Sequence, residues 1–80
     1  MTAERAILHT LNQSWPLLVR LTVLVIEVQS YSKVTLTTRE VQEHLDKLER
    51  KHQVVLVRSE ERELKAKITD AGMARLLEGE

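Results

Sequence analysis

His9, His44 and His52 are the side chains of this 80-residue chain best suited to proton transfer or metal binding. They are scattered along the sequence, and none stands beside a nucleophile at catalytic spacing. Glu40 lies one helical turn before His44 and could share a metal ion with it, although such a pair is more often exposed and unligated. The chain contains no cysteine, which removes thiolate ligands and thiol catalysis. We therefore predict a protein that is not an enzyme and that holds no metal or cofactor.

The overall composition is that of one small domain. Twelve Lys and Arg residues balance twelve Asp and Glu residues, and 42% of the chain is apolar. A chain of this length supports one thin core, so we predict a single domain over residues 1–80. So small a domain has little volume for a buried ligand, and no small-molecule effector is evident.

Two features of the sequence bear on location and on the class of partner. The longest apolar stretch, residues 17–26, is broken by Arg20 and is too short to span a bilayer. Because the chain contains no cysteine that could form a disulfide, nothing indicates an oxidising compartment. We therefore expect a cytoplasmic protein without membrane contact. Trp15 and Tyr31 are the two aromatic residues, too few for the base-stacking surface of a single-stranded RNA binder.

The amino-terminal segment predicts a helix followed by a break. Apolar residues recur at helical spacing over residues 2–13, and Thr2 can serve as the N-cap. Ser14 and Pro16 then interrupt the pattern. Because the first amides of a helix lack intrahelical partners, a proline costs little there, and we place the start of a second helix at this point.

The segment 17–28 is compatible with either a helix or a strand. Helical spacing connects Leu17, Leu18, Leu21, Leu24, Val25 and Val28, whereas Val19, Leu21, Val23 and Val25 alternate as in a strand. Its length favours a helix, with a loop over residues 29–36. Such a helix is apolar nearly all round and needs a second burial surface. That surface is either a homodimer interface through residues 17–28 or a neighbouring helix of the same chain.

Clearer signals begin at Thr37. This residue and Glu40 stand in the register of a capping box, which predicts a helix over residues 37–51. The helix carries one apolar stripe, at Val41, Leu45 and Leu48. Strand-like alternation then replaces helical spacing, with Leu64, Ala66 and Ile68 on one face, and predicts a hairpin over residues 53–69. Thr69 or Asp70 caps a short final helix.

These elements predict an α+β fold that is mainly helical with a small antiparallel hairpin. Their order is that of a winged helix-turn-helix domain, with a three-helix core, a wing and a short carboxyl-terminal helix. Residues 37–78 resemble the recognition helix, wing and closing helix of the MarR-, PadR- and ArsR-like bacterial regulators. The matching motifs are Leu45 and Leu48, Val54 and Val55, the charged residues 58–62, and Thr69, Asp70, Ala71 and Gly72.

The resemblance covers about half the chain and departs from the family pattern in three places. His52 stands where the family has a glycine ending the recognition helix, and histidine tolerates left-handed backbone better than most residues. Gln53 replaces an apolar residue and suggests an exposed strand start. The interval from Ser30 to Thr37 is longer than a tight helix-turn-helix connection. Gly72 is expected to allow close backbone approach between the last helix and the core.

The resemblance implies a sequence-specific regulator of transcription, of bacterial or phage type, that binds double-stranded DNA. Helix 37–51 would enter the major groove, and the hairpin 53–69 would act as the wing. The implied contact residues are Thr38, Arg39, Gln42 and Glu43 for base edges, Lys33 and Thr37 for the backbone, and Arg58 and Arg62 on the wing. Arginine can bind guanine with two hydrogen bonds, and glutamine can bind adenine.

The charge balance leaves a second interpretation open. Segment 37–51 carries four basic and four acidic residues, and loop 58–63 carries two against three. Duplex affinity depends largely on neutralised phosphates, so a neutral domain must concentrate its cations on one face or bind weakly. The helix charges could instead form solvated pairs, such as Glu43 with Lys47 and Asp46 with Arg50. The alternative function is a winged-helix protein–protein interaction module that does not bind DNA.

Overall fold

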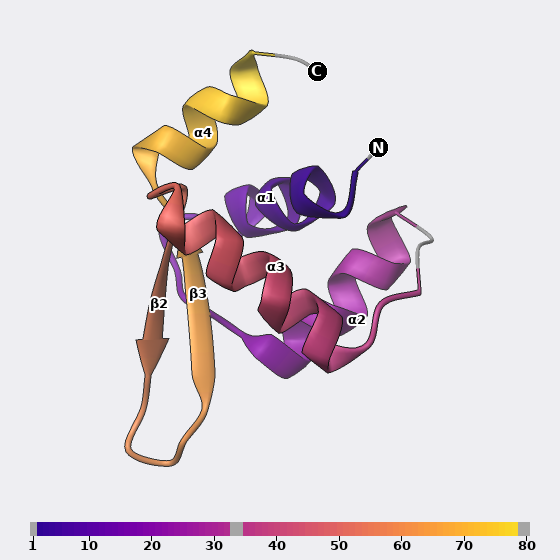
Figure 1. The fold of residues 1–80 in the computed structure, drawn as a ribbon, viewed down its shortest axis with the longest axis vertical. Coiled ribbons are helices and arrows are strands. Elements are labelled where there is room, and N and C mark those ends of the chain that lie inside the picture. The colour runs from indigo at the N-terminus through magenta and orange to yellow at the C-terminus, as the bar shows by residue number, and fades with distance from the viewer. Residues whose placement is uncertain (1, 33–34, 79–80) are drawn as a thin grey trace.

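The structure is a computed structural model that describes residues 2–32 and 35–78 (Figure 1). Over these residues the chain forms four helices and a three-stranded antiparallel sheet, in the order α1, β1, α2, α3, β2, β3, α4. Their bounds are α1 Ala3–Gln13, β1 Val19–Arg20, α2 Leu21–Ser32, α3 Thr38–Arg50, β2 Val54–Arg58, β3 Leu64–Ile68 and α4 Asp70–Leu77. The strand order is β1-β3-β2. The predicted α+β fold is confirmed, and its topology is consistent with a winged helix-turn-helix.

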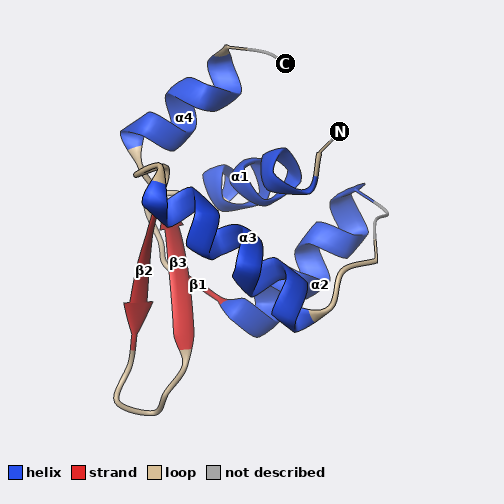
Figure 2. Cartoon of the chain, viewed as in Figure 1, coloured by secondary structure: helices blue, strands red, loops and turns tan. Residues whose placement is uncertain are grey.

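One core lies between the helices and one face of the sheet (Figure 2). The sheet supplies alternate residues of β3, because side chains of a strand point to opposite faces in turn. Leu64, Ala66 and Ile68 are buried, and Val54 of β2 lies opposite Ile68. The helices contribute Ile7 and Leu11 from α1, Leu24 and Val28 from α2, and Val41, Leu45 and Leu48 from α3. In the described part of the chain, no helix is long and apolar enough to cross a membrane.

The prediction of one helix over residues 17–28 is wrong at its beginning. Val19 and Arg20 form β1, which pairs with Ala66 and Lys65 of β3. The helix begins at Leu21 and continues to Ser32, so it is displaced toward the carboxyl terminus and takes up part of the expected 29–36 loop. Pairing with β3 buries Val19 and satisfies backbone groups that a helix would satisfy internally. The long interval after residue 30 is thereby shortened, because α2 occupies its first part.

The helices, strands and caps predicted over residues 37–77 are confirmed. Thr37 caps α3, and the Thr37–Glu40 capping box forms in both directions. Thr69 caps α4 by accepting from the amide of Gly72. His52 has a φ of 61°, the left-handed conformation expected where the helix ends, and its carbonyl accepts from the hydroxyl of Thr69 at 2.6 Å.

Gly72 is required by its surroundings. A Cβ at this position would collide with the backbone carbonyl of Gln53 and lie 2.6 Å from Cγ1 of Ile68. The carbonyl of Gln53 also accepts from the amide of Thr69 at 3.1 Å. Half-buried Gln53 thus precedes β2 as part of the junction between the hairpin and α4, rather than as an exposed strand start.

Candidate nucleic-acid interface

The beginning of α3 is held by its capping box. The hydroxyl of Thr37 accepts from the amide of Glu40 at 3.1 Å, and the Glu40 carboxylate accepts from the amide of Thr37 at 3.0 Å. This backbone hydrogen bond lowers the pKa of Glu40 below its ordinary value. The first turn of the helix is therefore fixed in place with a polar, exposed surface.

The structure does not support a metal pair of Glu40 with His44. Glu40 is engaged in the capping box, and Nδ1 of His44 lies 3.4 Å from Oε2 of Glu4 on α1 instead. No group of three or more potential metal ligands occurs among the described residues.

The outward face of α3 carries more positive than negative charge. Arg39, Glu43, Lys47 and Arg50 recur at helical spacing on the side away from the buried stripe, and all four are exposed. Half-buried Asp46 lies on the same side, three residues after Glu43 and four before Arg50. Although helix segment 37–51 is neutral as a whole, three of these five outward residues are cations, because Glu40 and Glu49 lie toward the flanks. The helix thus separates its charges more than the sequence count suggests.

One ion pair forms along this face. Nε of Arg39 lies 3.5 Å from Oε1 of Glu43, with the two side chains 89% and 63% exposed. Neither of the expected pairs, Glu43 with Lys47 and Asp46 with Arg50, forms within the described residues. So exposed a pair contributes between about 0 and 1 kcal/mol to stability, and either side chain can leave it for another partner at little cost.

The implied contact residues fall on two elements. Thr37, Thr38, Arg39 and Glu43 are exposed at the beginning of α3, and Gln42 is half-buried beside them. Lys33 lies outside the described residues. In Figure 1, the first turn of α3 and the hairpin loop lie toward the same end of the molecule.

The hairpin carries the other two implied contacts. Arg58 is the last residue of β2, and Arg62 lies in the loop with a φ of 63°. The loop is closed by hydrogen bonds from the amide of Ser59 to the carbonyl of Glu63 at 2.9 Å and from the amide of Arg62 to the carbonyl of Ser59 at 3.0 Å. Both arginines are exposed, but their loop also presents Glu60 and Glu61.

The sequence interpretation missed a second group of cations, on the outer face of the sheet. Lys65 and Lys67 alternate with the buried residues of β3, and Arg20 of β1 lies opposite Lys65. The alternation in residues 63–69 already indicated that the lysines face away from the core. No local signal could place Arg20 beside them, because it depends on the pairing of β1 with β3.

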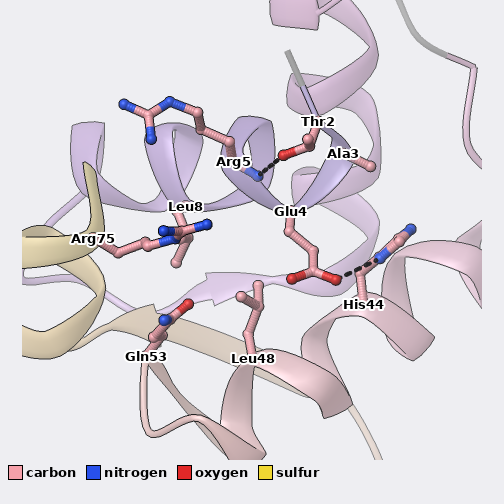
Figure 3. A pocket seen from close by; sticks show the side chains of 9 residues that line it. All are labelled: Thr2, Ala3, Glu4, Arg5, Leu8, His44, Leu48, Gln53 and Arg75. Carbon is pink, nitrogen blue, oxygen red and sulfur yellow. Dashed lines mark hydrogen bonds and ion pairs between the residues drawn. The ribbon is translucent and has the colours of Figure 1, made fainter. Parts of the chain in front are cut away.

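A cleft of about 620 Å³ lies between α1, α3 and α4 (Figure 3). Leu8 and Leu48 form its middle, with Arg75 and Gln53 toward one end and Glu4 and His44 toward the other. Its α3 residues belong to the inward side of that helix, so the cleft is separate from the outward face. Nothing in the sequence indicates this cleft, because its walls come from distant segments.

Glu4 connects α1 to α3 at one end of this cleft. Its carboxylate lies 3.3 Å from Nζ of Lys51 and 3.4 Å from Nδ1 of His44, the second without the geometry of a directed hydrogen bond. Partial burial acts to raise the pKa of Glu4, but Lys51 and His44 together lower it by more. The net result is a pKa below the ordinary value and a polar link between the two helices.

Comparisons of this chain with protein-family models, with curated proteins and with solved structures found no match. The arrangement of its own residues is therefore what supports a function.

Proposed function

We propose that this protein is a sequence-specific double-stranded DNA-binding regulator of transcription, related in type to the MarR-, PadR- and ArsR-like regulators of bacteria or phages. Helix α3 would enter the major groove, and the hairpin over residues 53–69 would act as the wing. The observation that carries the proposal is the outward face of α3, where Arg39, Lys47 and Arg50 outnumber the exposed acid Glu43 and the half-buried acid Asp46. A neutral domain that binds DNA must concentrate its cations in this way.

The proposed contacts follow from the chemistry of each side chain at the beginning of α3. Arg39 and Gln42 would bind base edges, and the hydroxyls of Thr37 and Thr38 would bind phosphates. Glu43 would accept from the amino group of cytosine. The ion pair of Arg39 with Glu43 is no obstacle, because both side chains are mostly exposed and each can turn to a base. Lys33, Arg58 and Arg62 would add backbone contacts from the connection before α3 and from the wing.

Binding as a symmetric homodimer would raise the affinity of so nearly neutral a domain, because two weak half-sites act together. The proposed interface lies within residues 17–28, where Leu17, Leu18, Val23 and Ile26 are exposed. Ile26 is 67% exposed and Leu17 is 69% exposed, which is unusual for large apolar side chains gathered in one short segment. These residues belong to the turn before β1 and to α2, rather than to one continuous helix.

The test is a mobility-shift titration of the whole chain on random and genomic duplexes across a range of salt concentrations, beside a measurement of solution mass. We expect the logarithm of the binding constant to fall steeply with the logarithm of salt concentration. Arg39→Ala should weaken binding about tenfold or more without changing the thermal stability of the domain. Arg75→Ala is the matched control, since it removes the same charge from exposed α4 and should leave binding unchanged. Equal affinity of the wild type and Arg39→Ala would exclude the proposed reading surface.

A second candidate function is a protein–protein interaction module with the same fold. The exposed apolar residues of segment 17–26, in a chain of zero net charge, favour this alternative. The salt titration separates the two functions, because an interaction module would bind no duplex even at low salt.

A further inference from the structure

The outer face of the sheet presents a row of cations beside a row of valines. The pairing register of β2 with β3 places Val55 opposite Lys67 and Val57 opposite Lys65. Arg20 of β1 continues the cationic side, because it lies opposite Lys65. We call these five residues, Arg20, Val55, Val57, Lys65 and Lys67, the outer sheet face. They point away from the core formed by Leu64, Ala66 and Ile68.

The arrangement of the three cations is unfavourable in the isolated molecule. Like charges directly opposite each other on neighbouring strands destabilise a sheet, and Arg20 and Lys65 are such a pair. Glu63 relieves part of the repulsion, with its Oε2 at 3.4 Å from Nε of Arg20. The side chains of Lys65 and Lys67 make no ion pair or hydrogen bond with any described residue. The face therefore holds a net positive charge within a chain whose own net charge is zero.

Protection of a sheet edge does not account for both lysines, because Lys65 has a paired strand on each side. Lysines often protect the edge strands of a sheet against pairing with other chains, but β3 is the central strand here. The edge strand β2 instead carries Val55 and Val57, which are 45% and 39% exposed. Val55 and Val57 thus lie on the edge strand β2, Lys65 and Lys67 on the central strand β3, and Arg20 on the opposite edge strand β1.

We propose that the outer sheet face is a docking surface for an acidic amphipathic helix of a partner protein. Residues two apart on a strand, such as Lys65 and Lys67, are separated by about 6.6 Å. Acidic residues four apart on a helix rise by about 6 Å and can face both lysines. Neighbouring strands are about 4.8 Å apart, so a helix lying along the strands covers the valine row with an adjacent apolar stripe.

The valines distinguish this partner from nucleic acid. A phosphate backbone would neutralise the three cations but would leave Val55 and Val57 against a charged, hydrated surface. An acidic amphipathic helix neutralises the same cations and removes the valines from water.

The experiment uses the whole chain and a synthetic helical peptide of about 16 residues, with glutamates four apart beside a stripe of leucines. We expect salt-dependent binding to the wild-type protein, measured by fluorescence anisotropy. A peptide with serine in place of leucine should bind about tenfold more weakly, and one with glutamine in place of glutamate should lose its salt dependence. The double variant Lys65→Gln/Lys67→Gln should reduce binding by about tenfold or more. The control Lys47→Gln/Arg50→Gln removes the same charge from α3 and should bind the peptide as the wild type does.

Two results would overturn the proposal. The first is a failure of the wild-type protein to bind the peptide at low salt, or an equal peptide affinity of the wild type and Lys65→Gln/Lys67→Gln. The other comes from duplex binding by the same variants. If Lys65→Gln/Lys67→Gln loses duplex affinity as strongly as Lys47→Gln/Arg50→Gln, the outer sheet face belongs to a nucleic-acid interface. Failure of all variants and the wild type to bind any duplex would contradict the DNA-binding function alone, because the peptide titration does not depend on it.

Discussion

Helices α2 and α3 lie next to each other but differ in how their outer surfaces are composed. In α3, the buried residues form one stripe, and every exposed side chain is polar or charged. In α2, Leu24 and Val28 are buried, but Val23 and Ile26 remain exposed. A helix surface like that of α3 is compatible with water or with a polar partner, whereas the apolar surface of α2 gains free energy when another surface covers it. The contrast separates the proposed DNA-binding surface from the proposed dimer surface.

The largest expected effect distinguishes the buried stripe of α3 from the exposed side of α2. Leu45→Ala should lower the free energy of unfolding by about 2 to 5 kcal/mol, because Leu45 is fully buried and its truncation leaves a cavity. Ile26→Ala, on mostly exposed Ile26, should change it by less than about 0.5 kcal/mol at protein concentrations where the chain is a monomer. Urea denaturation followed by circular dichroism measures both. A small effect of Leu45→Ala would mean that α3 does not pack as described.

A smaller effect distinguishes how the two helices begin. Thr37→Ala removes the cap of α3 and should lower the free energy of unfolding by about 1 kcal/mol, whereas Thr37→Ser should retain most of the stability. Thr22→Ala in the first turn of α2 is the matched control, because α2 follows β1 directly and Thr22 makes no capping hydrogen bond. Thermal denaturation compares the three variants. Equal losses for Thr37→Ala and Thr22→Ala would contradict a special role of the capping box.

The smallest effect concerns how each helix is connected to α1. The ring of Tyr31 on α2 stacks on His9 with centroids 4.4 Å apart, whereas α3 is linked through the Glu4 carboxylate. The folded-state pKa of Glu4 is lowered, so its stabilisation is fully present above the ordinary value of 4.5 and is lost as pH falls through the lower folded value. Glu4→Gln should lower the free energy of unfolding by less than about 1 kcal/mol near neutral pH.

The difference in stability between Glu4→Gln and the wild type should narrow as pH falls below 4.5, when measured by urea denaturation at several pH values. Tyr31→Leu serves as the control, because the stacked pair contains no carboxylate. If the difference in the free energy of unfolding between the wild type and Glu4→Gln is constant with pH, the carboxylate charge does not stabilise this contact.

The start of α3 could be predicted from the sequence, whereas the outer sheet face could not, because sequence patterns report only contacts between residues close together in the chain. Thr38, Arg39 and Glu43 could be placed on an exposed helix start, because the capping box and the stripe at Val41 and Leu45 fix that helix locally. The outer sheet face could not be assembled, although the outward direction of Lys65 was evident from strand alternation. Arg20 reaches it only through pairing between distant segments.

The sequence by itself determined the elements whose signals lie within a few residues of one another. These are the cap at Thr37, the stripe of α3, the alternation of β3, the cap at Thr69 and the left-handed turn at His52. Tertiary structure alone decided the state of Val19 and Arg20. The spacing of apolar residues in segment 17–28 is compatible with a helix and with a strand, and the backbone of β3 supplies the hydrogen bonds that make these two residues a strand. That pairing also sets the beginning of α2, and with it which apolar side chains of α2 remain exposed.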